Sequence, residues 1–148
     1  MTRSKRLYRI ADHVGQDQEA AARELTLLGG QLQEAEEQLD RLQDYCRGYH
    51  QQLAAAQASG GSAARLANYS QFLVRLNEAI RQQEQNVAAA GRAFERQREV
   101  WIAARARVKA VEKAAERCAE DEQRTEEQRE QRVNDDLNLN RLMRGKQP

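Results

Sequence analysis

Apolar residues recur at alternating spacings of four and three along the first third of the chain. The positions are Leu7, Ala11, Val14, Gln18, Ala21, Leu25, Leu28, Leu32, Ala35, Leu39, Leu42, Cys46, Tyr49, Leu53 and Ala56. Only Gln18 interrupts the series. A heptad pattern sustained for this length predicts one long helix that buries its apolar stripe, or seam, in a coiled coil.

A second series with the same spacing follows a short gap. It runs through Leu66, Tyr69, Leu73, Leu76, Ile80, Gln83, Val87, Ala90, Phe94, Gln97, Trp101, Ala104, Val108, Val111, Ala115 and Cys118. The gap contains Ser59-Gly60-Gly61-Ser62, the clearest turn signal in the chain. We therefore expect an all-α fold: one domain over residues 1–148, a long two-helix antiparallel coiled-coil hairpin. Its arms span about residues 5–57 and 65–140, its loop spans about residues 58–64, and the paired part of each arm is roughly 75 Å long.

Antiparallel pairing about this loop places residue i opposite about residue 121 − i. Gly29 and Gly30 then lie level with Gly91. Glycine inside a helix costs about 1 kcal/mol relative to alanine. Two interpretations remain open: a hinge at this level, or close packing of the helices through small residues.

The second arm is longer than its partner. Residues beyond about 118 have nothing to pack on, and residues 120–130 are polar on all sides. Such a helix depends on ion pairs between successive turns or on a partner. Apolar residues return at Val133, Leu137, Leu139, Leu142 and Met143. This end is either a frayed terminus or an element that becomes ordered inside a partner.

An uncharged row lies near the loop, on both arms. It comprises Gln38, Leu42, Tyr45 and Tyr49 on the first arm and Phe72, Leu76, Ala79 and Gln83 on the second. The pairing rule sets Tyr49 opposite Phe72, and Gln38 opposite Gln83. Gln38, Tyr45, Phe72 and Ala79 flank the seams, so they either form a binding surface or merely widen the seam.

Composition and motifs point away from catalysis. The net charge is +1, with 24 basic and 23 acidic residues, which argues against nucleic acid as the main partner. Cys46 and Cys118 fall at seam positions far apart, and His13 and His50 are isolated. No phosphate-binding loop or metal-ligand spacing occurs, so we expect no enzyme activity, metal or cofactor. No apolar run is long enough for a membrane span or a signal peptide, which predicts a cytoplasmic protein without a transmembrane segment.

The chain resembles the flagellar export protein FliJ family over nearly its whole length. The resemblance is carried by Asp44-Tyr45 with Tyr49, by Asn68-Tyr69 and Gln71-Phe72, and by the Trp101 neighbourhood. It implies a non-enzymatic stalk in the flagellar type III export apparatus, with a role in flagellum biogenesis and motility. Its implied partners are the export ATPase FliI with its regulator FliH, the membrane export gate protein FlhA, and export chaperones. It also implies attachment to the cytoplasmic side of the inner membrane.

The resemblance assigns a partner to each end of the hairpin. Residues matching the gate-binding row are Gln38, Leu42, Tyr45, Tyr49, Phe72, Leu76, Ala79 and, with a weaker correspondence, Gln83. The candidates for contact with the ATPase ring are Arg3, Lys5, Arg6, Arg9, Arg124, Val133, Leu137 and Leu142. The basic start could equally be a solvated terminus or approach anionic lipid. Two alternatives stay open: a stalk of a virulence-type secretion system, and a structural or chaperone-like hairpin without an ATPase partner.

Overall fold

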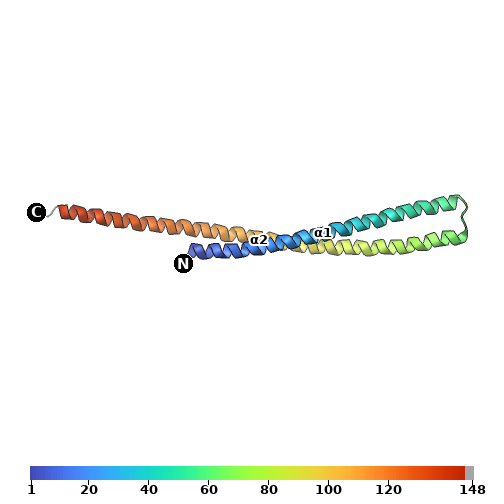
Figure 1. The fold of residues 1–148 in the computed structure, drawn as a ribbon, viewed down its shortest axis with the longest axis horizontal. Coiled ribbons are helices and arrows are strands. Elements are labelled where there is room, and N and C mark those ends of the chain that lie inside the picture. The colour runs from blue at the N-terminus through green and yellow to red at the C-terminus, as the bar shows by residue number, and fades with distance from the viewer. Residues whose placement is uncertain (146–148) are drawn as a thin grey trace. The chain divides into compact units, whose positions relative to one another are not determined.

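Two α-helices account for almost all of the chain. The computed structural model describes residues 1–145, in which α1 spans Arg3–Ala58 and α2 spans Ala63–Gly145 (Figure 1). The helices pack against each other as a hairpin, and residues 1–145 contain no strand. Alanine, glutamine, glutamate, arginine and leucine dominate both segments, and all are strong helix formers. The predicted all-α hairpin is confirmed.

The turn between the helices follows from its glycine and serine residues. Gly60 has a φ of 71°, a left-handed conformation that favours glycine. The amide of Gly60 donates to the carbonyl of Gln57 at 3.3 Å, and the amide of Gly61 donates to that of Ala56 at 2.9 Å. These two bonds form a Schellman motif, which closes the last turn of α1.

Serine and threonine cap the starts of the two helices. The Ser62 hydroxyl accepts a hydrogen bond from the Arg65 amide at 3.3 Å, as an N-cap residue does. At the start of α1, the Thr2 hydroxyl accepts one from the Lys5 amide at 3.4 Å. Both caps satisfy amides that have no partner within their own helix.

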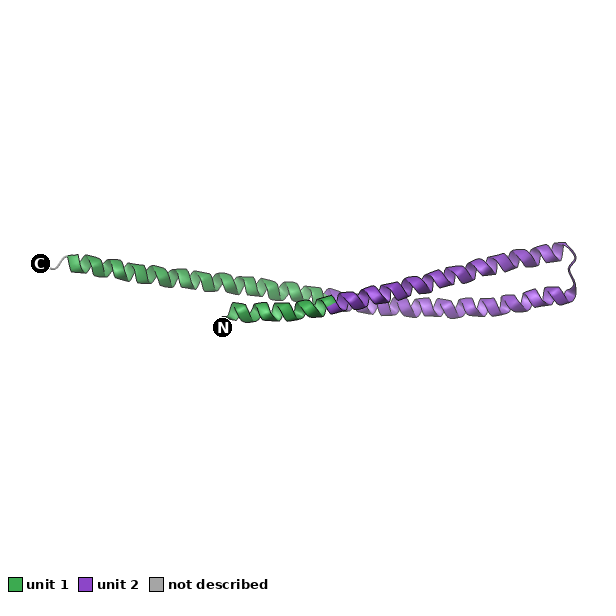
Figure 2. Cartoon of the chain, in the orientation of Figure 1, with its two compact units in different colours: residues 1–19, 103–148 green, residues 20–102 purple. Residues whose placement is uncertain are grey.

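The chain divides into two compact units, coloured separately in Figure 2. The terminal unit consists of residues 1–19 and 103–148, and the loop unit consists of residues 20–102. Each unit contains a piece of α1 and a piece of α2. Each also buries its own apolar seam: Ala11, Val14 and Ala115 in the terminal unit, and Ala21, Leu73 and Leu76 in the loop unit.

Glutamine side chains cross the seam of the loop unit at two levels. Gln83 Nε2 donates to the carbonyl of Ala35 at 2.9 Å, and Gln97 Nε2 donates to the carbonyl of Ala21 at 3.2 Å. Alanine opposite each glutamine leaves the carbonyl within reach. Polar residues at seam positions restrict a helix pair to the register in which they find partners. Gln83 thus pairs with Ala35, within three residues of the predicted Gln38.

The glycines of the loop unit allow close packing. A Cβ atom added to Gly29 would lie 3.2 Å from the Phe94 ring, tighter than ordinary contact. One added to Gly91 would lie 3.9 Å from Leu32, whereas one on Gly30 would meet open space. Phe94 therefore fills the volume that a side chain at Gly29 would need. This favours the close-packing interpretation at Gly29 over the hinge.

Candidate partner-binding surfaces

The uncharged row of the loop unit divides into exposed and packed residues. Tyr45 is 63% exposed and Phe72 is 41% exposed. Gln38 and Ala79 are exposed as well. Leu42 and Tyr49 are half-buried, while Leu76 and Gln83 are buried in the seam. The four exposed residues can therefore contact a partner directly, whereas the other four lie in the seam between the helices.

Three aromatic rings gather at the loop end of this row. The Tyr49 and Phe72 rings lie with centroids 4.3 Å apart and planes tilted by 32°. This is the predicted pairing of Tyr49 with Phe72. The Tyr69 ring lies 6.4 Å from Tyr49 at an angle of 59°. We call Tyr49, Tyr69 and Phe72 the aromatic cluster. Such tilted contacts stabilise the rings beyond their burial and hold them in fixed positions.

Two grooves adjoin the aromatic cluster, and Tyr49 lines both. The first, of ≈ 350 Å³, is lined by Arg41, Asp44, Tyr45, Gly48, Tyr49 and Gln52. The second, of ≈ 300 Å³, is lined by Tyr49, Arg65, Asn68, Tyr69 and Phe72. Arg41, Arg65 and Tyr69 were not among the residues predicted for this surface. Arg65 precedes Phe72 by one heptad, and Arg41 precedes Tyr45 by one helical turn, so their spacing was the available signal.

The terminal unit closes on a polar contact between its helices. Glu122 accepts hydrogen bonds from the Ser4 amide at 3.1 Å and from the Ser4 hydroxyl at 2.5 Å. The Ser4 hydroxyl and then the Ser4 amide hold the pKa of the Glu122 carboxyl below its ordinary value. The Cys118 thiol donates to the same carboxylate at 3.6 Å. Its pKa is raised, first by desolvation and then by the charge of Glu122.

This contact changes where helix pairing ends. The last apolar seam residue of α2 predicted an end at about residue 118. Ser4 and Glu122 extend the pairing by about one helical turn, since a buried polar pair can continue a seam when its hydrogen bonds are satisfied. Ser4 is buried and Glu122 is partly buried.

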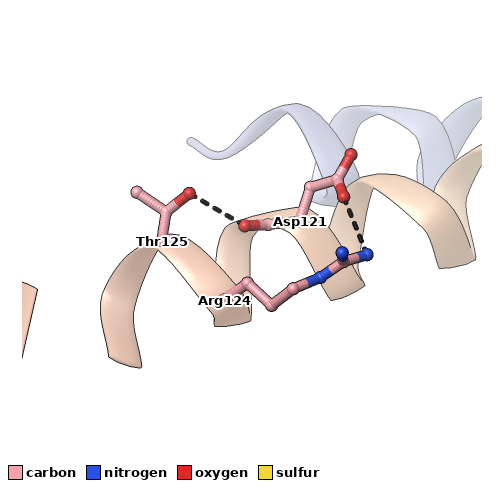
Figure 3. A network of polar contacts seen from close by, with 3 residues as sticks. All are labelled: Asp121, Arg124 and Thr125. Atoms are coloured by element: carbon pink, nitrogen blue, oxygen red, sulfur yellow. Dashed lines mark hydrogen bonds and ion pairs between the residues drawn. The ribbon is translucent and has the colours of Figure 1, made fainter. Parts of the chain in front are cut away.

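Beyond Glu122, α2 continues without a covering helix. Every residue from Gln123 to Gly145 is exposed, and we call this segment the overhang. Two residues in the first turn of the overhang contact Asp121, which precedes it (Figure 3). Arg124 pairs with the Asp121 carboxylate at 3.2 Å, and the Thr125 hydroxyl donates to the Asp121 carbonyl at 2.9 Å. A further pair joins Arg129 and Glu126 at 3.8 Å. Exposed pairs of this kind support a helix only weakly.

The apolar residues of the overhang do not share one face. Val133 and Leu137 are four residues apart, so they lie on the same side of the helix. By the 3.6-residue period Leu142 falls on the opposite side, and Leu139 and Met143 fall between it and Val133 along one flank of the helix. All five are exposed. The apolar residues of the overhang thus spread around more than half of the helix, and a partner that covered all five would have to contact the helix on opposite sides.

The basic residues predicted to meet the ATPase ring are accessible. Arg3, Lys5, Arg6 and Arg9 are exposed in the first turns of α1. Arg124 is exposed but already forms an ion pair with Asp121. Nothing in the structure assigns these residues a partner, so their role stays a prediction.

The acidic, histidine and cysteine side chains of the described residues are dispersed along the helices. Within residues 1–145, no group of three or more His, Cys, Asp or Glu side chains could bind a metal ion. Cys46 and Cys118 are free thiols. No helix in this part of the chain is long and apolar enough to cross a membrane.

Comparison with known proteins identifies a family for this chain. The chain matches the family model described as "Flagellar FliJ protein" over residues 3–147. No curated protein and no solved structure matches it.

Proposed function

The chain belongs to the FliJ family of flagellar proteins, and from this premise we propose that it is a non-enzymatic stalk of the bacterial flagellar type III export apparatus. In this proposal it links the FliI ATPase ring, with its regulator FliH, to the membrane gate protein FlhA. It promotes assembly of the ATPase and assists in handling export substrates and their chaperones. It acts in the cytoplasm, attached to the cytoplasmic side of the inner membrane through its partners.

The exposed overhang is the observation that carries this proposal. All of Gln123–Gly145 is helical and solvent-exposed, yet it presents five large apolar side chains. An isolated helix without tertiary packing is marginally stable in water. A partner that encloses the overhang would bury Val133 and Leu137 on one side and Leu142 on the other. A ring-shaped ATPase offers such an enclosure, whereas a flat surface covers one side only.

The loop unit supplies the second surface. Tyr45 and Phe72 are exposed on a packed helix pair and carry no charge. Large aromatic side chains of this kind dominate the energy of many protein interfaces. In the proposal these residues, with Gln38 and Ala79, contact the gate protein. Leu42, Tyr49, Leu76 and Gln83 hold them in position from the seam.

The flagellar description of the family favours this proposal over a virulence-type stalk. It also favours an export role over a structural hairpin without an ATPase partner. The chain supplies no catalytic group in this account. Hydrolysis belongs to FliI, and the chain acts by contact alone.

A binding and rate measurement with FliI tests the proposal. We expect the chain to co-purify with FliI and FliH and to raise the ATPase rate of FliI. The double substitution Val133→Ser with Leu142→Ser removes one apolar group from each side of the overhang. It should weaken the complex while leaving the helicity of the chain nearly unchanged, since neither residue is packed.

Val74→Ser is the matched control. Val74 is as exposed as the overhang residues but lies in the loop unit. Its substitution should leave FliI binding intact. No complex with FliI, and no change in its rate, would contradict the stalk and favour the structural hairpin.

A further inference from the structure

The two grooves beside the aromatic cluster each have an arginine at the edge. Arg41 lines the first groove and Arg65 lines the second. Neither arginine makes a hydrogen bond or ion pair through its side chain within residues 1–145. The carboxylate in the first groove, Asp44, pairs with Arg47. No carboxylate lines the groove of Arg65, and the one that lines the groove of Arg41 pairs with Arg47, so both guanidinium groups are open to a partner at the ends of an apolar surface.

Both grooves open on the same side of the loop unit. Arg65 and Phe72 occupy equivalent heptad positions on α2, as Tyr45 and Gln52 do on α1. These positions flank the seam on one side of an antiparallel pair. Tyr49 lines both grooves and contacts Tyr69 and Phe72. The grooves are thus two halves of one surface divided by the aromatic cluster.

We infer that this surface takes a segment of the gate protein that carries apolar side chains between two carboxylates. The inference rests on the proposed contact with FlhA and assigns it a chemistry. The apolar side chains lie against Tyr45, Tyr49 and Phe72, and one carboxylate meets each of Arg41 and Arg65. Arginine suits this role because its planar group binds a carboxylate through two parallel hydrogen bonds.

The spacing of the arginines sets the length of that segment. Arg65 lies opposite about residue 56 of α1, so it is separated from Arg41 by roughly 20 Å of helix rise. An extended strand of about six residues spans this distance, as does a helix of roughly four turns. Closely adjacent acidic residues could not reach both arginines.

Charge substitutions with intact FlhA in detergent micelles test the inference. Arg41→Gln and Arg65→Gln should each weaken binding by about two- to fivefold, the range of an exposed ion pair. The double variant should bind with less dependence on salt, because the screened charges have been removed. Arg41→Lys keeps the charge and should retain most of the affinity.

Arg81→Gln is the matched control. Arg81 is an exposed arginine of the same unit at a heptad position on the other side of α2. Its removal should leave the affinity and its salt dependence unchanged. Thermal melting of every variant should match that of the unsubstituted chain, since no arginine changed here supports the fold through an ion pair.

The outcomes distinguish a failure of the acidic-segment inference from a failure of the proposed contact with FlhA. If Tyr45→Ala with Phe72→Ala weakens binding while both arginine variants bind normally, the gate contact stands and the acidic segment is wrong. If the unsubstituted chain does not bind FlhA, both the gate contact and the inference fail. An equal loss for Arg81→Gln would show a general charge effect and would also overturn the inference.

Discussion

The loop unit and the overhang both expose apolar side chains, but they support them differently. Tyr45 and Phe72 stand beside a buried seam, where Leu73 and Leu76 join the two helices. Val133 and Leu142 lie on a single uncovered helix, beyond the exposed Arg129–Glu126 ion pair. The first surface is held by tertiary packing, whereas the second depends on local helix propensity.

This difference predicts different binding behaviour. A surface held by packing loses little conformational freedom when it binds, so most of its contact energy appears as affinity. The overhang is a helix without tertiary packing, so it is marginally stable in water, and each backbone residue that a partner has to fix costs about 1–2 kcal/mol. The overhang therefore needs an extensive partner surface, while the loop unit can use a small one.

The largest expected contrast is between Leu76 and Leu142. Leu76 is 7% exposed and Leu142 is 64% exposed. Leu76→Ala should lower the free energy of unfolding by about 2–4 kcal/mol through lost burial and an unfilled cavity. Leu142→Ala should change it by less than about 0.5 kcal/mol, as surface substitutions do. Urea denaturation followed by circular dichroism measures both.

Equal losses for the two variants would break the comparison. They would mean that Leu142 is packed in solution, for example against a second copy of the chain. The concentration dependence of the Leu142→Ala midpoint identifies that case, since self-association makes stability depend on protein concentration.

A smaller contrast separates the two neighbouring glutamines. Gln83 crosses the seam to the Ala35 carbonyl, whereas Gln82 is exposed and donates to Asn86 on its own helix. Gln83→Ala should cost about 1–2 kcal/mol, because it removes a buried hydrogen bond and its packing. Gln82→Ala should be almost neutral. Matching denaturation midpoints for the two variants would show that Gln83 does not hold the register.

Heptad spacing was sufficient to predict the hairpin, and the glycine-serine gap to predict its turn. Pairing about that gap set Tyr49 opposite Phe72, where the rings meet. The repeat defines which faces of the two helices meet, and the short loop restricts the register in which they pair. The exposure of Gln38, Tyr45, Phe72 and Ala79 beside the seam followed from the same periodicity.

Side-chain contacts between polar residues could not be predicted from the heptad spacing. The Ser4–Glu122 bonds join residues far apart in sequence, and neither residue departs from an ordinary helix composition. Arg41 and Arg65 are two of many arginines in a highly charged chain. Their distinction is their place at the edges of the two grooves beside the aromatic cluster, which depends on rotamers and on the exact register. The heptad period predicts which face of a helix a residue occupies. It does not predict which charged residues on that face form ion pairs.

The smallest expected effect is on the pH dependence of the melting temperature, through the Ser4–Glu122 contact at the end of the helix pair. Ser4 holds the pKa of Glu122 below its ordinary value, so the carboxylate stabilises the folded terminal unit at pH values above about 4.3. That stabilisation is lost as the pH falls through the lowered pKa. Glu122→Gln should therefore lose less melting temperature between pH 7 and pH 3 than the unsubstituted chain. Glu120→Gln, which changes an exposed neighbour, should behave like the unsubstituted chain. If all three proteins lost the same melting temperature between pH 7 and pH 3, Glu122 would not secure the start of α1.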